Sequence, residues 1–217
     1  PIEIVQEEFN QFPVQPKIGF TFATALRTVL RQDPDVVMLG EIRDPETAEH
    51  AVQAALTGHL VLSTLHTNDA ASAVTRLLDL DIYPFLIASV LQGVIAQRLV
   101  RRICPNCAVD EILSEDQVLS LRIGGARGRK LGVKRGAGCI KCRGTGYRGR
   151  TGVFEVLPIT PRIGKLIADR APSVEIKKEA LNDGMMTLRE YAIKKMAMGE
   201  TTYEEVLAMT DEVNVYT

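Results

Sequence analysis

The sequence contains no long hydrophobic run, no segment typical of a secretory signal and almost no net charge. Its most apolar stretch, residues 85–100, is interrupted by Ser89, Gln92 and Arg98, so it is too short and too polar to span a bilayer. The first residues lack the basic start and the apolar core of a signal peptide. A net charge of −1 argues against electrostatic binding of the whole chain to DNA or to a membrane.

Charge is nevertheless distributed unevenly along the chain. Residues 98–150 contain 13 Lys and Arg against 4 Asp and Glu, whereas residues 1–97 contain 5 against 12 and residues 151–217 contain 8 against 11. Within the basic part, residues 122–135 hold six basic side chains, four glycines and no acid. We interpret 122–135 as a solvated flexible loop, and attraction to anionic lipid headgroups or to an acidic partner is the alternative.

The first half of the chain has the pattern of a βαβ unit. Short apolar runs rich in β-branched residues predict buried strands at 36–39 and 60–65. Between them, Asp44-Pro45 is a typical helix start and Gly58 a typical helix end. A strand, a helix and a strand at this spacing predict parallel pairing of the two strands. Further helices are predicted at 21–32, at about 69–80, at 84–99 and in several short pieces after Pro161.

Glu41 and His66 directly follow the two predicted strands. Because ligands bind outside the carboxyl ends of parallel strands, both side chains are expected at one edge of the sheet. Phosphoryl transfer to water requires an acceptor that orients the water and donors that stabilise charge on the phosphate. Glu41 suits the first role; His66, Arg27 and Arg31 suit the second, the two arginines being one helical turn apart. The alternative is that Glu41 and His66 are ordinary polar residues at loop starts.

The four cysteines form two Cys-x-x-Cys pairs, Cys104 with Cys107 and Cys139 with Cys142. Four thiolates in two such knuckles are typical of a closed tetrahedral zinc site, and iron in the same cage is an alternative. The site is expected to be structural, holding the base of the intervening segment together. A zinc module beside a basic segment also allows binding to nucleic acid, but Tyr147 is the only aromatic residue between Pro105 and Val153.

Longer strings carry a family resemblance. Residues 21–44, TFATALRTVLRQDPDVVMLGEIRD, and 54–69, AALTGHLVLSTLHTND, resemble the Walker B and histidine-box segments of the type II secretion and type IV pilus assembly ATPases. Residues 81–107 and 138–157 resemble the stretches that follow in that family. The resemblance covers nearly the whole chain and is weakest at 108–137 and after Val174.

The resemblance implies a RecA-like P-loop NTPase fold that works as a homo-hexamer and hydrolyses ATP with Mg²⁺ at its subunit interfaces. It also implies a role for each matching residue. Glu41 corresponds to the Walker B glutamate, and Gly40 to its neighbour that senses the γ-phosphate. His59 and His66 correspond to the histidine box, and Glu3 to the tail of an aspartate box. Arg27 and Arg31 correspond to the paired arginines that reach phosphate.

One motif of ATP-binding proteins is absent from the sequence. The phosphate loop has the pattern Gly-x-x-x-x-Gly-Lys-Ser/Thr, and the only Gly-Lys here, Gly164-Lys165, is followed by leucine. In the family this loop lies upstream of the segment that matches Pro1. We therefore expect the chain to be the C-terminal part of a motor domain that by itself neither binds nor hydrolyses ATP.

The predicted architecture is α/β in three consecutive parts. Residues 1–103 form the downstream part of a RecA-like core with a parallel sheet, 104–142 the four-cysteine zinc module and 143–217 a mainly helical region. The expected function is a hexameric ATPase for type II secretion or type IV pilus assembly, peripheral to the cytoplasmic face of the inner membrane. Its expected partners are a membrane platform protein and a cytoplasmic adaptor, without nucleic acid. The alternatives are a nucleic-acid-binding zinc module and a DNA-uptake motor of the same family.

Overall fold

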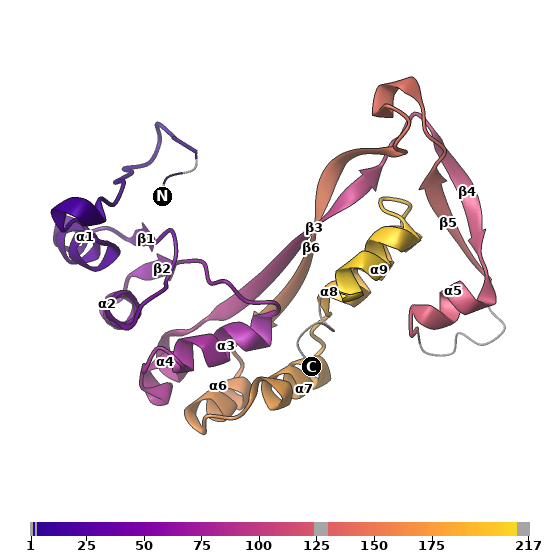
Figure 1. The fold of residues 1–217 in the computed structure, drawn as a ribbon. Helices are drawn as coiled ribbons and strands as arrows, with labels where there is room; N and C mark the ends of the chain where they lie inside the picture. Colours follow the sequence, from indigo (N-terminus) through magenta and orange to yellow (C-terminus); the bar gives the residue numbers. More distant parts are fainter. Residues whose placement is uncertain (1, 3, 124–129, 212–217) are drawn as a thin grey trace. The chain divides into compact units, whose positions relative to one another are not determined.

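The computed structural model describes residues 2, 4–123 and 130–211, which form two compact units (Figure 1). The first unit combines the residues up to 94 with 157–182, and the second combines 95–156 with the residues from 183 onward. The chain thus leaves the first unit, returns to it and leaves it again. The sequence analysis instead expected three consecutive parts.

The first unit begins with the predicted βαβ arrangement. The two strands β1 (Val36–Met38) and β2 (Leu60–Leu62) pair in parallel, with Val36 opposite Leu60 and Met38 opposite Leu62. The burial predicted for both strands is wrong: these four residues are exposed, because among the described residues the sheet has only these two strands. The Asp44 side chain accepts a hydrogen bond from the Thr47 amide at 2.8 Å and so caps the intervening helix, as the sequence predicted. The elements are η1 (Pro16–Ile18), α1 (Phe22–Val29), η2 (Leu30–Gln32), β1 (Val36–Met38), α2 (Pro45–Leu56) and β2 (Leu60–Leu62).

A small apolar core holds α1 against α2 and the sheet. Leu26, Val37, Leu39 and Ala51 are buried together. A stripe of apolar residues at helical spacing packs against them, its members being Phe22, Val29 and Leu30. Burial of this stripe fixes where α1 lies, and α1 carries Arg27 on its exposed side.

Four helices complete the first unit, and they pack in pairs that are distant in sequence. α4 (Pro84–Val90) packs on α6 (Pro161–Ala168), and α3 (Ala70–Leu78) packs on α7 (Ser173–Asn182). Asp69 caps α3 through the Ser72 amide, and Lys177 Nζ lies 2.7 Å from Asp69 Oδ2. No helix in the described ranges is long and apolar enough to cross a bilayer.

The second unit contains two two-stranded sheets and three α-helices among its described residues. β3 pairs with β6, and β4 pairs antiparallel with β5. The core includes Val100, Leu113, Val133, Val153 and Met196. The elements are β3 (Gly93–Ile103), β4 (Ala108–Leu113), α5 (Glu115–Ser120), β5 (Leu131–Gly136), η3 (Ile140–Cys142), β6 (Tyr147–Pro158), α8 (Leu188–Ala197) and α9 (Tyr203–Asp211). The first two residues of β3 and the last two residues of β6 belong to the first unit.

The predicted helix at 84–99 is wrong. α4 ends at Val90, and Gly93–Ile103 is a strand paired with β6. Along β3 burial alternates: Val94, Ala96 and Arg98 are partly buried, whereas the residues between them are exposed. Apolar residues at this density fit both the period of a helix and the period of a strand. Pairing with a strand about fifty residues further on selects the extended form.

The basic segment 122–135 is also corrected in part. Leu131–Gly136 forms β5 and pairs with β4 residue by residue, so it is not a loop. Residues 124–129 lie outside the described residues. The β6 strand likewise precedes the helices of the region that was expected to be mainly helical.

Candidate active site and four-cysteine site

The edge at which β1 and β2 end is held by hydrogen bonds that continue the strand pairing. The Leu39 amide donates to the Leu62 carbonyl at 2.8 Å, and the Ile42 amide donates to the Thr64 carbonyl at 3.1 Å. The Thr64 hydroxyl donates to the Gly40 carbonyl at 2.7 Å. The two chain segments therefore remain side by side past the strands, which fixes the backbone on either side of Glu41.

Glu41 and His66 meet at this edge. His66 Nε2 lies 3.3 Å from Glu41 Oε2, which confirms the predicted juxtaposition. Arg43 is a third member that the sequence analysis missed: its Nε lies 2.6 Å from the same carboxylate oxygen. Arg43 is two positions after Glu41 in a non-helical segment, where side chains two positions apart can share one side, so this spacing could have revealed it.

The surroundings of Glu41 favour its ionised form. Its side chain is only 13% exposed, and this burial raises the pKa of the carboxyl. Hydrogen bonds and charge from Arg43 and His66 outweigh that effect and lower the pKa below its ordinary value. The result is a carboxylate that can accept a hydrogen bond from water, beside a largely exposed imidazole and guanidinium.

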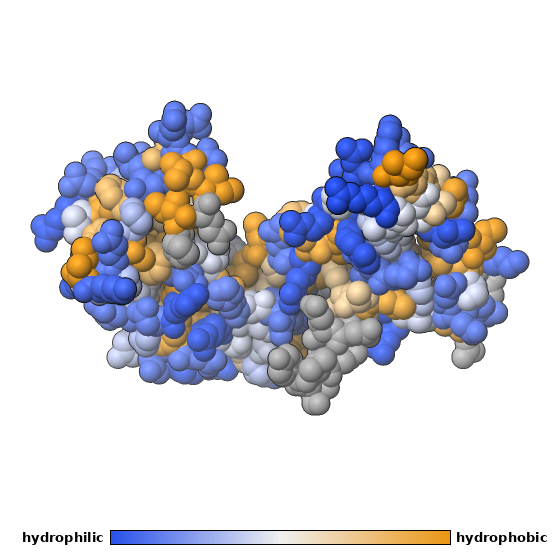
Figure 2. Space-filling view, turned by 45° about the horizontal axis from the view of Figure 1, so that its top comes forward, coloured by the Kyte–Doolittle hydropathy of each residue, from blue (hydrophilic) through white to orange (hydrophobic). Residues whose placement is uncertain are grey.

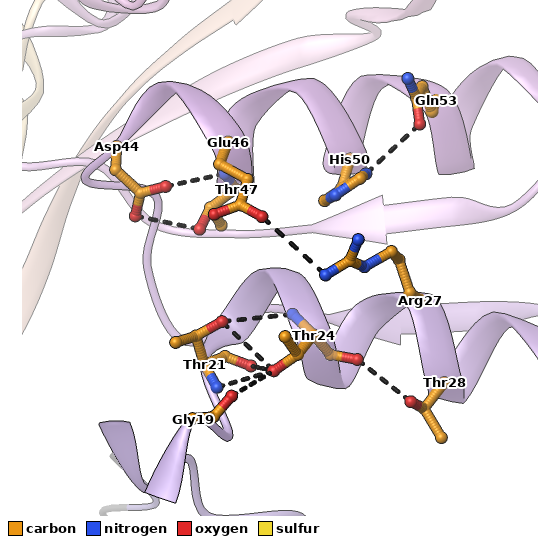
Figure 3. Close-up of polar contacts among 10 residues, drawn as sticks. All are labelled: Gly19, Thr21, Thr24, Arg27, Thr28, Asp44, Glu46, Thr47, His50 and Gln53. Carbon is orange, nitrogen blue, oxygen red and sulfur yellow. Dashed lines mark hydrogen bonds and ion pairs between the residues drawn. The ribbon is translucent and has the colours of Figure 1, made fainter. Parts of the chain in front are cut away.

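The two predicted phosphate arginines lie apart from this pair. Arg27 Nη2 is 4.0 Å from Glu46 Oε1, an exposed pair between α1 and α2 (Figure 3). Arg31 lies on η2 and is exposed; it is not on the same regular helix as Arg27, because α1 ends at Val29. In the described part of the chain no hydrogen bond or ion pair joins either arginine to Glu41.

The residues expected to contact the nucleotide occupy different places. Gly40 lies at the Glu41 edge. His59 precedes β2, at the opposite end of that strand from His66, and its Nδ1 lies 3.0 Å from the Ala54 carbonyl at the end of α2. Glu3 lies outside the described residues. The roles of these residues stay predictions.

The four cysteines converge as the two knuckles predicted. Their Sγ atoms all lie within 4.8 Å of one another. The separations are 3.9 Å between Cys104 and Cys139, 3.9 Å between Cys107 and Cys142, and 3.7 Å between Cys139 and Cys142. A tetrahedral zinc ion with bonds of about 2.3 Å needs sulfurs about 3.8 Å apart, so these distances fit the ion.

Backbone donors support this donor set. The amides of Cys139 and Gly146 point at Cys142 Sγ, at 3.1 and 3.3 Å. Burial raises the pKa of the Cys142 thiol, but these donors outweigh it and lower the pKa to about 6, which favours the thiolate of Cys142. Burial and the neighbouring thiols raise the pKa of Cys107 to about 12. The Cys104 amide also donates to the Gly146 carbonyl at 2.9 Å and joins the end of β3 to the start of β6.

Comparison with known proteins places this geometry in a family. Residues 1–208 match the family model described as type II/IV secretion system protein. The chain belongs to this family. It is 48% identical over 212 residues to the type IV pilus assembly ATPase PilB of Thermus thermophilus, covering 98% of this chain and 24% of that protein. It is also 48% identical over 212 residues to the type II secretion system protein E of Dickeya dadantii, covering 98% of this chain and 42% of that protein.

Solved structures agree with the family. The pilus retraction motor PilT with bound ADP matches with a TM-score of 0.59 and 29% identity, over 87% of this chain and 43% of that one. The ATPase DotB of Legionella pneumophila has a TM-score of 0.65 at 21% identity, over 98% of this chain and 50% of that one, which shows likeness of fold. The α/β fold is therefore that of the RecA-like motor ATPases. The chain spans half or less of each of these relatives.

Proposed function

We propose that this chain is the downstream part of a motor that hydrolyses ATP to power type II secretion or type IV pilus assembly. The observation that carries the proposal is the 3.3 Å contact between Glu41 Oε2 and His66 Nε2 at the carboxyl ends of two parallel strands. Family membership and the ATPases among the relatives support it. Phosphoryl-transfer sites of α/β proteins use this edge of the sheet.

In this proposal Glu41 is the residue that orients the attacking water. Its carboxylate is ionised at neutral pH and rests on a backbone held at Gly40 and Ile42. Arg27, Arg31 and His66 then stabilise charge that grows on the γ-phosphate of Mg-ATP. Arg27 and Arg31 lie on exposed surface, so they are suited to reach a nucleotide held against a neighbouring copy. Gly40, His59 and Glu3 are proposed to contact the nucleotide.

The four cysteines are proposed to bind one structural Zn²⁺. When bound, the ion fixes the turn of η3 against the end of β3, because its ligands come from both segments. The protein is further proposed to act as a homo-hexamer on the cytoplasmic face of the inner membrane. A membrane platform protein and a cytoplasmic adaptor are its proposed partners.

The decisive experiment measures ATP hydrolysis by the complete motor protein with and without Glu41→Gln. The amide keeps the shape of the side chain but does not accept the proton of the attacking water, so turnover is expected to fall by more than about tenfold with ATP binding nearly intact. A variant that keeps most of its turnover would show that Glu41 is not the catalytic carboxylate. Strong, salt-dependent binding of DNA by the chain would favour the nucleic-acid alternative instead.

The missing phosphate loop gives a second test. The 217-residue chain alone is expected to bind Mg-ATP negligibly in isothermal titration, because no backbone cradle and lysine of the required spacing are in its sequence. Micromolar affinity of the isolated chain would contradict this part of the proposal.

A further inference from the structure

The turn between Cys139 and Cys142 presents an isoleucine almost entirely to solvent. Ile140 is 96% exposed, more than any other large hydrophobic residue in the described ranges. The Cys142 and Gly144 amides both donate to the Cys139 carbonyl, at 3.2 and 2.9 Å. This bonding keeps the backbone of the turn tight, and the Ile140 side chain lies on it exposed to solvent. A single exposed apolar side chain is ordinary on a protein surface, so the residues around Ile140 decide whether it has a function.

Three exposed cations surround this turn in the sequence and lack partners. Lys141, Arg143 and Arg148 are exposed, and none has an ion pair or side-chain hydrogen bond in the part of the chain that the structure describes. No acidic residue occurs between residues 117 and 154. Four other cations of the same unit are paired with acids, as shown by Arg101–Glu205, Lys134–Asp110, Arg135–Glu111 and Lys195–Glu200. The turn therefore carries unpaired positive charge, with no acidic residue close to it in the sequence.

One apolar side chain beside exposed cations suits a lipid surface better than a protein partner. Figure 2 shows apolar surface bordered by strongly hydrophilic residues at the end of the second unit that carries the turn before β6. A specific protein interface buries about 800 Å² on each side around a cluster of apolar anchors, whereas the turn offers one apolar side chain. A bilayer needs only an apolar side chain that enters the interface and cations that attract anionic headgroups.

We propose that Ile140, Lys141, Arg143 and Arg148 form a membrane-contacting tip. The isoleucine enters the interfacial layer of an anionic bilayer, and the three cations contact headgroup phosphates. The inference deepens the proposed function, because it names the residues through which a motor at the inner membrane touches lipid. It does not depend on ATP hydrolysis, since lipid binding and turnover are measured separately.

Sedimentation with vesicles tests the tip in the 217-residue chain. The chain is expected to bind vesicles of phosphatidylglycerol and phosphatidylcholine in roughly equal parts, and not vesicles of phosphatidylcholine alone. Ile140→Ser is expected to weaken binding by about tenfold, because it removes the apolar contact. Lys141→Glu with Arg148→Glu is expected to weaken it by at least about 25-fold, at about fivefold for each cation lost. Zinc content and circular dichroism show whether each variant is folded.

Matched controls separate the tip from general surface effects. Ile112→Ser removes a 69% exposed isoleucine from β4 of the same unit, and Lys178→Glu reverses an exposed cation on α7; both are expected to bind vesicles like wild type. Equal losses in the controls, or equal binding to both vesicle types, would overturn the proposal. The proposal would also be overturned if the wild-type chain sedimented without vesicles and Ile140→Ser abolished this sedimentation. The turn would then contact another copy of the chain.

Fluorescence gives an independent readout. The sequence contains no tryptophan, so Ile140→Trp reports on this turn alone. Its emission is expected to shift to shorter wavelength with anionic vesicles and to remain unshifted with neutral ones. Unshifted emission with both vesicle types would contradict insertion of the turn. If the tip binds lipid while Glu41→Gln keeps its turnover in the complete protein, the proposed catalytic site fails and the tip stands.

Discussion

Arg43 Nε lies 2.6 Å from Glu41 Oε2, on the segment that directly follows β1. This contact and the hydrogen bond from His66 hold the pKa of Glu41 below its ordinary value although burial raises it. The electrostatic state of the candidate catalytic carboxylate therefore depends on an arginine two residues away in sequence.

The first prediction concerns the pH dependence of turnover. Arg43→Gln removes the guanidinium that lowers the pKa of Glu41, whereas the burial that raises this pKa remains. The pKa of Glu41 is therefore expected to rise. The acid limb of the kcat profile is then expected to move to higher pH, because the carboxylate becomes protonated earlier as the pH falls. Profiles measured on the complete motor protein check this. Coincident acid limbs in wild type and variant would show that Glu41 does not control turnover.

The second prediction separates a phosphate role of Arg27 and Arg31 from a surface role. Lysine keeps the charge but loses the planar fork, so Arg27→Lys or Arg31→Lys is expected to lower turnover of the complete protein by at least about tenfold, or about 1.4 kcal/mol of barrier. Thermal stability is expected to change little, because the Arg27–Glu46 pair is exposed and contributes under about 1 kcal/mol.

Glu46→Gln is the matched control for the arginines. It breaks the same ion pair from the other side, so it is expected to leave turnover unchanged. If both lysine variants hydrolyse ATP like wild type, the arginines are surface residues. If Glu46→Gln lowers turnover as much as Arg27→Lys does, the ion pair rather than phosphate contact explains the effect.

The third prediction is one zinc ion for each chain. Elemental analysis of freshly purified, reduced protein is expected to find it, and Cys107→Ser is expected to lower the content strongly, because one of four ligands is lost. Structural zinc contributes on the order of 10 kcal/mol in small modules, so a chelator is expected to unfold residues 104–142 locally. Hydrogen exchange of these residues checks the unfolding. Reduced protein that is folded and free of metal would disprove the prediction.

The fourth prediction concerns the contact between α3 and α7. Asp69 caps α3 and also pairs with Lys177, whose Nζ is 2.7 Å away. Asp69→Asn keeps the cap and loses the ion pair, and is expected to cost under about 1 kcal/mol of unfolding free energy. Asp69→Ala loses both and is expected to cost about 1–2 kcal/mol. Denaturant unfolding of the chain measures both values, and equal costs would show that the cap contributes nothing.

The same residue gives the sign of a pH effect. Burial raises the pKa of Asp69, but the hydrogen bonds from Lys177 and Ser72 outweigh it and lower the pKa in the folded chain. A carboxyl whose pKa is lower when folded contributes stability above its unfolded pKa, near 3.9, and loses it as the pH falls through the folded value. Wild type is therefore expected to lose more stability than Asp69→Asn between neutral pH and about pH 3.

The sequence by itself determined the local parts of this protein. Apolar runs with β-branched residues located β1 and β2, and Asp44-Pro45 located the start of α2, because strand propensity and capping depend on neighbouring residues. The burial predicted for the two strands was wrong. From these elements the meeting of Glu41 and His66 at one edge followed, since parallel strands align their carboxyl ends. Two Cys-x-x-Cys pairs likewise predicted a cluster of four thiols.

Only the tertiary structure decided the rest. Gly93–Ile103 resembles a continuation of α4 and becomes a strand because β6, about fifty residues later, supplies its hydrogen-bond partner. Leu131–Gly136 becomes a strand because β4 pairs with it. The contact of Arg43 with Glu41, and the exposure of Ile140, also depend on where the folded backbone points each side chain. Short-range patterns specify caps and periods, whereas pairing and exposure depend on residues that are distant in sequence and brought close only by folding.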